Sequence, residues 1–394
     1  MMKKTKVLYL SYDGIMEPIG QSQILPYILE LSKKYSIYIL TYEKFKDIKN
    51  YKLKLSIEKK LIDNNINWKF IVYKSNSFLS CLNIFKGFCI SLYITFKYKI
   101  KFYHLRSYIP GLITFFLIIL FRKKFIFDIR GFWIDEKADR LNLNKNSIKY
   151  ILFKNIEKIL MIKSSHIVTL TNESKNIIIK KFSNIRRNKI SIIPTCVQTD
   201  NFSYNKKQSN KNKNIIFCYL GSIDTAYDFN KVLNLFNMYK DIDKKIFLKI
   251  VTNSKRKLVL KYIKHHGLNK NQFSIENCEH SEIHKLINSS NIGIFYAKSN
   301  FSIKASFPTR IGEFLSCGKP IICNNFNRDI NYLINKNNLG IISNFEEKNS
   351  YVELTKIKQM LKNNSTRKRI INFVDKNLSL EIAIKKYLKI YNQL

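Results

Sequence analysis

Residues 304–323 read KASFPTRIGEFLSCGKPIIC, and this stretch decides the fold class. Proline is favoured at the start of a helix and glycine just past its end, so Pro308 and Gly318 predict a short helix between them. Pro320 then opens an apolar run that ends at Cys323 and predicts a buried strand. A helix that leads directly into a buried strand is the repeating unit of an α/β protein.

The same alternation of short apolar runs and helix-period stretches continues along the chain in both directions. The strands predicted in the first half are Lys6–Leu10, Ile37–Thr41, Trp68–Tyr73, Phe102–Leu105, Lys124–Asp128, His166–Leu170 and Lys189–Ile193. Those predicted in the second half are Ile215–Leu220, Ile246–Val251, Phe273–Ile275, Ile292–Tyr296, Pro320–Cys323 and Leu339–Ile342. Predicted helices include Ser22–Lys34, Phe85–Tyr98, Gly111–Phe121 and Ile148–Lys163. We therefore expect an α/β protein with two Rossmann-like, doubly wound parallel sheets facing a central cleft, where ligands bind beyond the carboxyl ends of the strands.

Composition and charge limit the class of protein. The 394 residues are 45% hydrophobic, which excludes a mainly disordered chain. The formal net charge of +41 suggests nucleic acid, an anionic membrane or an anionic substrate, although lysine spread by a biased genome is an equally simple source. The sequence has no nucleic-acid-binding motif, so we expect no nucleic-acid partner. The seven cysteines form no CxxC pair, which argues against a zinc site and fits a reducing cytosol.

Two segments bear on membrane contact and domain limits. The N-terminus lacks the pattern of a signal peptide. The apolar run Gly111–Phe121 is too short to span a bilayer and predicts a buried helix, with an interfacial membrane segment as the alternative. The basic, aromatic stretch Phe78–Lys101 is a candidate for contact with an anionic membrane surface. The polar run over residues 204–214 predicts an interdomain linker or a surface loop, and residues 378–394 predict an amphipathic docking helix.

The loop after the first strand is a candidate ligand site. Gly14 and Gly20 allow the backbone to approach a ligand closely, and Gln21 precedes a helix start expected near Ser22. Free N–H groups at that start would favour an anion or a polyol. An ordinary strand-to-helix loop is the alternative.

Charged side chains follow the fourth and fifth strands. His104 and Arg106 lie on one side of the chain, where they could bind or protonate a substrate oxygen, or cap a loop. Asp128 and Arg130 stand near Trp133, either in a binding site or as a structural ion pair.

The helix that begins at Pro308 carries the strongest candidate site. Its first turn places the Thr309 hydroxyl and Arg310 beside the helix N-terminus, a favourable position for a diphosphate. Glu313, one turn further on, could accept hydrogen bonds from a ribose diol. The other candidates for the same ligand are Lys304, Ser306, Gly221 and Ser222.

In their order and spacing these stretches resemble the glycosyltransferases of family 4, two-domain enzymes of the GT-B fold with a nucleotide sugar in the interdomain cleft. The resemblance covers nearly the whole chain. The segments that carry it are Val7–Gly14, Gly20–Pro26, His104–Pro110, Asp128–Trp133, Ile193–Val197, Tyr219–Ser222 and Pro308–Glu313.

The resemblance implies roles for both domains. Residues 199–377 would bind the nucleotide sugar, and residues 1–198, completed by the helix 378–394, would bind the acceptor. Glu313 would match the second glutamate of the family's E-x7-E motif, and Gly221 and Ser222 its phosphate loop. His104 would match the histidine near the transferred sugar. Family members are generally retaining and use no bound metal or cofactor.

The sequence departs from the family at two places. Ala305 stands where the motif has its first glutamate, and residues 223–228 lack the usual basic residues for the diphosphate. We assign that function to Lys304 and Arg310.

We therefore expect a hexosyltransferase that moves a hexose from a nucleotide diphosphate sugar to a glycan or lipid-linked saccharide in cell-surface polysaccharide synthesis. The catalytic residues expected are His104, Arg130, Arg310 and Glu313, with no metal. The expected location is the cytoplasm or the inner face of the plasma membrane. The alternatives are a nucleotide-sugar epimerase or hydrolase of the same fold, or a basic protein that binds membrane surfaces.

Overall fold

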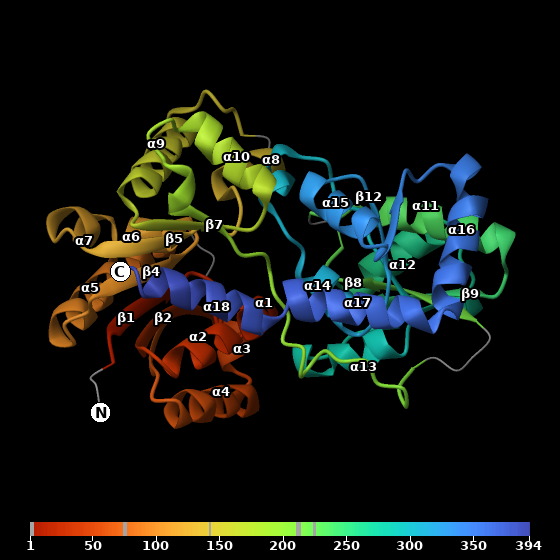
Figure 1. Ribbon diagram of the computed structural model, residues 1–394, viewed down its shortest axis with the longest axis horizontal. Helices are drawn as coiled ribbons and strands as arrows, with labels where there is room; N and C mark the ends of the chain where they lie inside the picture. Colours follow the sequence, from red (N-terminus) through yellow and green to blue (C-terminus); the bar gives the residue numbers. More distant parts are fainter. Residues whose placement is uncertain (1–3, 74–76, 142, 210–213, 224–225) are drawn as a thin grey trace. The chain divides into compact units, whose positions relative to one another are not determined.

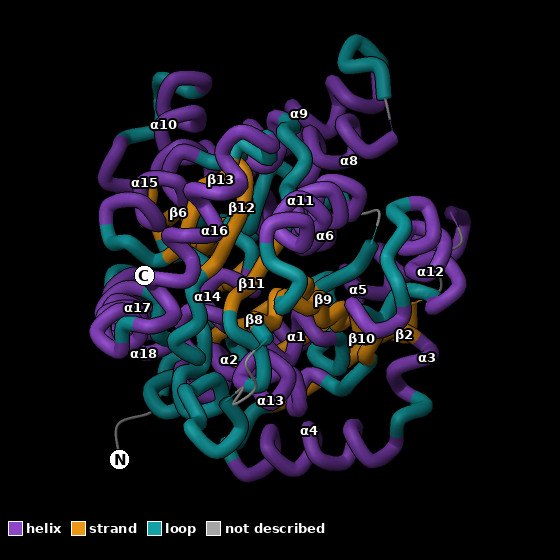
Figure 2. Tube along the Cα trace, turned by 90° about the vertical axis from the view of Figure 1, so that its right-hand side faces the viewer, coloured by secondary structure: helices purple, strands orange, loops and turns teal. Residues whose placement is uncertain are grey.

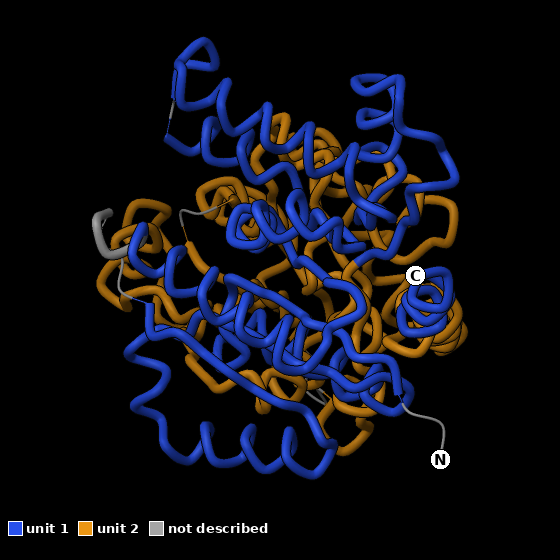
Figure 3. Tube along the Cα trace, turned by 90° about the vertical axis from the view of Figure 1, so that its left-hand side faces the viewer, with its two compact units in different colours: residues 1–194, 383–394 blue, residues 195–382 orange. Residues whose placement is uncertain are grey.

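The computed structural model describes residues 4–73, 77–141, 143–209, 214–223 and 226–394, with the backbone alone for residues 77–80. The chain folds into two compact units, unit 1 with residues 1–194 and 383–394 and unit 2 with residues 195–382 (Figure 3). Strands lie inside and helices outside (Figure 2).

Among the described residues, unit 1 contains a seven-stranded parallel sheet with the strand order β3-β2-β1-β4-β5-β6-β7 (Figure 1). The strands are β1 Lys6–Ser11, β2 Ser36–Lys44, β3 Asn67–Tyr73, β4 Phe102–Arg106, β5 Lys124–Asp128, β6 His166–Thr169 and β7 Ile190–Ile192. The apolar runs of β1, β4 and β5 are buried, as expected for a parallel sheet covered on both faces. Strand order reverses at β1, so the carboxyl ends of β1 and β4 form the switch point where ligands bind in such sheets.

Two helix predictions in unit 1 are wrong in detail. The helices are α1 Pro18–Gln23, α2 Leu25–Ser32, α3 Phe45–Ile48, α4 Tyr51–Asp63, α5 Ser77–Lys97, α6 Tyr108–Ile113, α7 Phe115–Leu120, α8 Trp133–Leu141, α9 Ile148–Lys163 and α10 Asn172–Lys181. The stretch predicted as one helix from Ser22 to Lys34 contains the end of α1, which begins at Pro18, and the whole of α2, which begins at Leu25. The helix predicted over Gly111–Phe121 is instead the pair α6 and α7, which meet at Thr114.

Helix α7 is only partly buried, with Leu117 and Ile118 buried and its other side chains more exposed. Phe116 is 62% exposed and Leu120 is 69% exposed, so the prediction of a buried helix fails for this half of the run. No helix in the described part of the chain is both long and apolar enough to cross a membrane.

Unit 2 repeats the α/β plan. Its described strands form a six-stranded parallel sheet with the order β10-β9-β8-β11-β12-β13. They are β8 Ile215–Leu220, β9 Ile246–Val251, β10 Phe273–Glu276, β11 Ile292–Ile294, β12 Ile321–Asn324 and β13 Gly340–Ser343. The helices are α11 Phe229–Ile242, α12 Arg256–His265, α13 Ile283–Asn288, α14 Thr309–Ser316, α15 Arg328–Lys336, α16 Glu347–Lys362 and α17 Asn364–Asn377. The predicted fold class of two parallel-sheet α/β domains is confirmed.

Helix α18, Leu380–Tyr391, returns from unit 2 to unit 1. The first domain predicted from the sequence ends at residue 198, whereas residues 195–198 lie in unit 2. They are held there because the N–H of Val197 donates to the Leu378 carbonyl and the N–H of Leu380 donates to the Val197 carbonyl, both at 2.8 Å. Of the predicted linker 204–214, residues 210–213 lie outside the described part of the chain.

Candidate functional site

The turn that leads into α14 is fixed by two buried side chains. Asn327 Nδ2 donates to three carbonyl oxygens of residues 303–306, at 3.1 to 3.3 Å. Thr195 Oγ1 donates to the carbonyl oxygen of Phe307 at 2.7 Å. Pro308 then caps the helix, which confirms the predicted helix start. The turn that carries Lys304, Ser306 and Thr309 is therefore held in one conformation by the rest of unit 2.

Arg310, in the first turn of α14, lies against aromatic rings. Its guanidinium carbon is 3.8 Å from the centroid of the Tyr227 ring, with the Tyr219 and Phe295 rings at 5.9 and 5.7 Å. Such contacts orient the guanidinium and stabilise its charge. Nη1 is buried and has no hydrogen-bond partner among the described residues. The aromatic contacts therefore fix the guanidinium while leaving hydrogen-bonding capacity unused.

Gly221, at the end of β8, lies beneath this guanidinium. Its φ is +139°, and a Cβ there would overlap Arg310 Nη2. The Gly221 N–H donates to the Val251 carbonyl at 3.0 Å, so this amide belongs to the sheet and is not free to bind a phosphate as the sequence analysis assumed. The glycine instead makes room for Arg310. Ser222 is exposed beside it, and Asp224 and Thr225 in the following stretch lie outside the described residues.

Glu313 lies one turn after Arg310 and is only 6% exposed. His280 Nε2 is 3.8 Å from Glu313 Oε1 and has no hydrogen-bond partner in the described part of the chain. His280 could not be predicted from the sequence, because a single histidine after β10 gives no pattern to recognise. Ala305, which stands in place of the family's first glutamate, is fully buried. The alanine methyl group offers no hydrogen bond to a ligand.

In unit 1, four of the predicted residues come together at the carboxyl ends of β4 and β5. His104 lies within β4 and is 1% exposed. Its Nδ1 is 2.7 Å from the Tyr391 hydroxyl and its Nε2 is 3.4 Å from Asp128 Oδ2, which also accepts a 2.8 Å hydrogen bond from Tyr387. Burial lowers the pKa of His104 and favours the neutral ring. We expected His104 to contact a substrate directly, but its ring is buried and has no exposed atom for that contact.

Two arginines flank this pair. Burial is the largest single influence and would raise the pKa of Asp128, but Arg130, His104 and Arg106 together outweigh it and hold the pKa below its usual value. Arg130 Nη1 is 3.9 Å from Asp128 Oδ1, so the two form an ion pair, the simpler of the alternatives left open by the sequence. Arg106 is 4% exposed, and its Nε lies 3.9 Å from Asp13 Oδ2. Arg106 Nε and Arg130 Nη1 both lack a hydrogen-bond partner among the described residues.

The loop after β1 is organised by a residue that the sequence analysis missed. Glu43 accepts hydrogen bonds from the N–H groups of Ile15 and Met16, at 2.8 and 3.1 Å. Gly14 is required because a Cβ there would overlap the Glu43 carboxylate. Ser22 lies inside α1, and the helix starts nearest to it are Pro18 and Leu25, so the anion site near Ser22 stays a prediction.

Three other predicted residues of unit 1 make structural contacts. Gln21 Nε2 donates to the Met16 carbonyl at 2.9 Å, and a Cβ on Gly20 would overlap the Gly14 carbonyl. The Trp133 ring packs against those of Tyr108 and Phe153, each with a centroid distance of 6.1 Å. These contacts tie Trp133 to α6 and α9.

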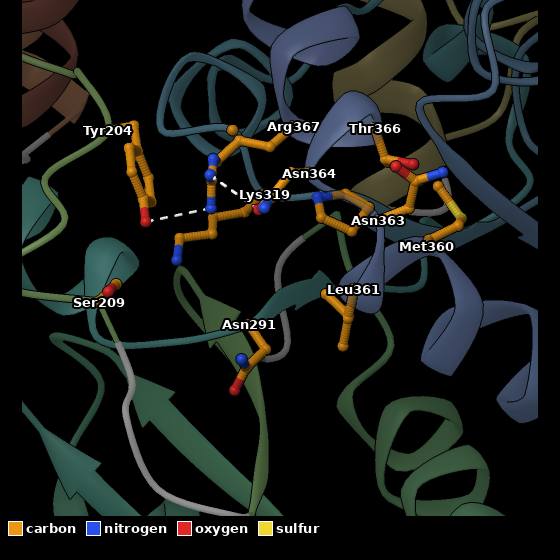
Figure 4. Close-up of a pocket in the computed structure, with 12 residues that line it drawn as sticks. Tyr204, Ser209, Asn291, Lys319, Met360, Leu361, Asn363, Asn364, Thr366 and Arg367 are labelled. Atoms are coloured by element: carbon orange, nitrogen blue, oxygen red, sulfur yellow. Dashed lines mark hydrogen bonds between the residues drawn. The ribbon is translucent and has the colours of Figure 1, made fainter.

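A cavity of about 170 Å³ lies elsewhere in unit 2 (Figure 4). Its walls include Lys319, whose pKa is lowered to about 8 by burial, and Arg367, which stacks on the Tyr204 ring at 4.2 Å. The cavity adjoins the amino ends of β11 and β12, whereas Gly221 and Arg310 lie at the carboxyl edge of the sheet. It is therefore separate from the candidate site. The described residues contain no group of three His, Cys, Asp or Glu side chains that could hold a metal ion.

Comparison with known proteins assigns a family to unit 2. Residues 201–376 match the family described as Glycosyl transferases group 1. The chain carries a glycosyltransferase group 1 domain. Arg310, Glu313, Gly221 and His280 all lie within it.

A curated relative and several solved structures extend the comparison. An uncharacterized glycosyltransferase from Methanocaldococcus jannaschii is 25% identical over 263 residues, which span 64% of this chain and 64% of the relative. A glycosyltransferase from Rickettsia africae has a TM-score of 0.70 at 17% identity and covers 99% of this chain and 98% of its own. Anabaena HepE in complex with UDP-glucose has a TM-score of 0.72 at 11% identity, with 99% of this chain and 100% of its own covered. These structures confirm the GT-B glycosyltransferase fold around the group 1 domain.

Proposed function

We propose that the protein transfers a hexose from a nucleotide diphosphate sugar to a hydroxyl group of a glycan or a lipid-linked saccharide. The bond between the sugar's anomeric carbon and the diphosphate breaks, and a bond to the acceptor oxygen forms. The acceptor proton passes to solvent or to the departing diphosphate. We further propose that the configuration of the sugar is retained and that the product belongs to a cell-surface polysaccharide.

The observation that carries the proposal is the placement of Arg310. Its guanidinium is fixed against Tyr227 at the carboxyl edge of the group 1 domain, with Nη1 unpaired among the described residues. A cation held in place before the reaction stabilises a developing negative charge without reorganisation. We assign to Arg310, with Lys304 and the N-terminus of α14, the binding of the leaving diphosphate. The proposed chemistry thus uses the chain's own positive charges in the place of a metal ion.

Glu313 is assigned to the ribose of the donor. Its carboxylate is largely buried, one helical turn from Arg310, and therefore has a fixed position relative to the proposed diphosphate. His280, 3.8 Å away, positions the carboxylate. The neighbouring hydroxyls of Ser306 and Thr309 are assigned to the phosphates.

Unit 1 is assigned to the acceptor. Arg130 and Ser107, at the carboxyl ends of β5 and β4, have φ values of +56° and +72°. Residues other than glycine adopt such angles at a cost in free energy, and residues strained in this way cluster at functional sites. We assign Arg106 and Arg130 to acceptor binding. His104 and Asp128 are assigned as residues that position these arginines.

A panel of nucleotides and nucleotide sugars in a thermal-unfolding assay tests the proposal. A donor present at 100 times its dissociation constant should stabilise the protein by about 2.7 kcal/mol. Release of nucleotide should then depend on an added acceptor. Absence of stabilisation by every nucleotide sugar would contradict the proposal. Conversion of the donor to an epimer without acceptor would favour an epimerase instead.

A Gly221→Ala variant tests the geometry of the proposed donor site. The new methyl group would occupy the position of Arg310 Nη2 and would also be strained at φ +139°. We expect the affinity for the nucleotide diphosphate to fall at least about tenfold, which corresponds to the loss of about one charged hydrogen bond. Titration calorimetry measures the change. Gly267, with φ +66° and open space around it, is the matched control, since alanine there adds backbone strain without touching Arg310. Equal donor affinity in the two variants would contradict the assigned role of Gly221.

A further inference from the structure

Helix α5 exposes several of its large apolar side chains, while most of its fully buried positions are small or polar. The buried positions are Ile94 and, spaced four residues apart, Asn83, Gly87, Ser91 and Thr95. The exposed side carries Leu82, Phe85, Tyr93 and Phe96, at 43%, 63%, 53% and 53% exposure. The surface helices of globular proteins normally do the reverse. An exposed apolar side of this kind marks an interaction surface.

Helix α7 extends this apolar surface. Phe116, Ile119, Leu120 and Phe121 are 44% to 69% exposed. The two helices touch through aromatic rings, because the Phe96 and Phe121 centroids are 5.0 Å apart and those of Phe88 and Phe116 are 6.5 Å apart. Figure 1 shows α5 and α7 on the same side of unit 1. We call the surface of Leu82, Phe85, Tyr93, Phe96, Phe116, Ile119, Leu120 and Phe121 the α5–α7 face.

The α5–α7 face belongs to a segment without negative charge. Between Asp63 and Asp128 the sequence has no acidic residue and ten basic ones. Exposed members of this basic set lie at the end of each helix, with Lys97 and Lys99 at the end of α5 and Arg122 and Lys124 after α7. The two helix ends are adjacent, since Lys123 Nζ donates to the Ile100 carbonyl at 3.0 Å. The apolar face thus has basic residues at its rim, one of which, Lys124, also donates to the Leu394 main-chain oxygen at 3.1 Å.

We propose that the α5–α7 face binds the surface of an anionic lipid bilayer. Aromatic and aliphatic side chains enter the boundary between headgroups and acyl chains, and the lysines and arginine at the rim contact anionic headgroups. The described helices cannot span the bilayer, so α5 and α7 lie in its surface. A second copy of the chain fits less well, because pairing this face with itself would bring two rims of the same charge together. The proposal concerns unit 1 alone and does not depend on the proposed function.

Sedimentation of the full chain with lipid vesicles tests the proposal. We expect binding to vesicles of phosphatidylcholine mixed with phosphatidylglycerol, weakened by salt, and little binding to phosphatidylcholine alone. The combined variant Phe85→Ser, Phe116→Ser and Leu120→Ser keeps every charge and should bind the mixed vesicles at least about tenfold more weakly. The combined variant Tyr332→Ser, Tyr351→Ser and Val352→Ser removes side chains of unit 2 that are 63% to 67% exposed, and should bind like the unaltered chain.

The control variant separates the α5–α7 face from the general attraction of a protein of net charge +41 to anionic lipid. Equal binding by both variants would overturn the proposal, as would failure of the unaltered chain to bind the mixed vesicles. Sedimentation velocity without lipid gives the remaining readout. A dimer of the unaltered chain that the Phe85→Ser, Phe116→Ser and Leu120→Ser variant dissociates would assign the face to self-association instead. Neither assay uses a donor or an acceptor, so failure here leaves the proposed function standing.

Discussion

Replacing Arg310 by alanine is expected to lower kcat/KM for sugar transfer by about 10²–10³-fold, the usual effect of removing one preorganised charge-stabilising group. The guanidinium carbon lies 3.8 Å from the centroid of the Tyr227 ring, and the guanidinium lies over Gly221, so alanine removes a charge whose position is fixed. The group 1 domain should remain folded, because Arg310 lies at the edge of its sheet. Steady-state kinetics with a radiolabelled donor gives the ratio, and circular dichroism reports on the fold.

The Arg310→Lys variant separates charge from geometry. Lysine keeps the positive charge but has neither the planar stacking surface nor the forked donors of arginine. We expect it to restore part of the activity, with a value between those of the alanine variant and the unaltered chain. Full activity in Arg310→Ala with any donor that stabilises the protein would remove Arg310 from the mechanism.

A chain that ends at Ile382 is expected to lose the cooperative unfolding of unit 1. The truncation removes the buried Ile384, Tyr387, Ile390 and Tyr391, and each such loss costs about 2–5 kcal/mol. Their sum approaches the whole stability of a domain, about 5–15 kcal/mol. The truncation also leaves the Asp128 carboxylate buried without its hydrogen bond from Tyr387. Differential scanning calorimetry should show one transition, that of unit 2, where the unaltered chain shows both units unfolding.

Two further chains calibrate this prediction. A chain that ends at Asn392 lacks only two residues outside the buried face of α18 and should unfold like the unaltered chain. The Tyr387→Phe variant keeps the ring and should lose about 1.5–3 kcal/mol, the worth of a hydrogen bond to a charged group. If the chain ending at Ile382 unfolded like the chain ending at Asn392, unit 1 would not need α18.

The positions of the strands could be predicted from the sequence, because strands that are buried on both faces are continuous apolar runs. Such a run is stable only in the interior of the protein. Strand β5 matches its prediction of Lys124–Asp128 residue for residue. Helices α6 and α7 could not be separated, since Thr114 gives no breaking signal in an apolar run. The exposure of α7 also could not be predicted, because the sequence is equally apolar whether a side chain faces a protein core or a lipid surface.

The residues of the candidate site also fall into those that could be predicted from the sequence and those that could not. Pro308 carries a local signal, so the helix start and the location of Arg310 could be predicted. Tyr227 and His280 come from other parts of unit 2 and reach the α14 turn only through the tertiary fold. Asp128 also accepts a hydrogen bond from Tyr387, 259 residues away along the chain, a contact that no local pattern encodes. Sequence thus identified the residues with local signals and missed those that orient them.

The return of α18 to unit 1 has a consequence for biosynthesis. Residues 383–394 leave the ribosome only after all of unit 2 has been made, while unit 2 is continuous in sequence. Domains generally fold as they emerge, so unit 2 has its whole chain available first, although it is translated second. Until translation reaches α18, the nascent N-terminal sheet keeps a groove that displays apolar side chains. We expect the growing chain to recruit chaperones that recognise exposed apolar surface, and to hold them throughout synthesis of the group 1 domain.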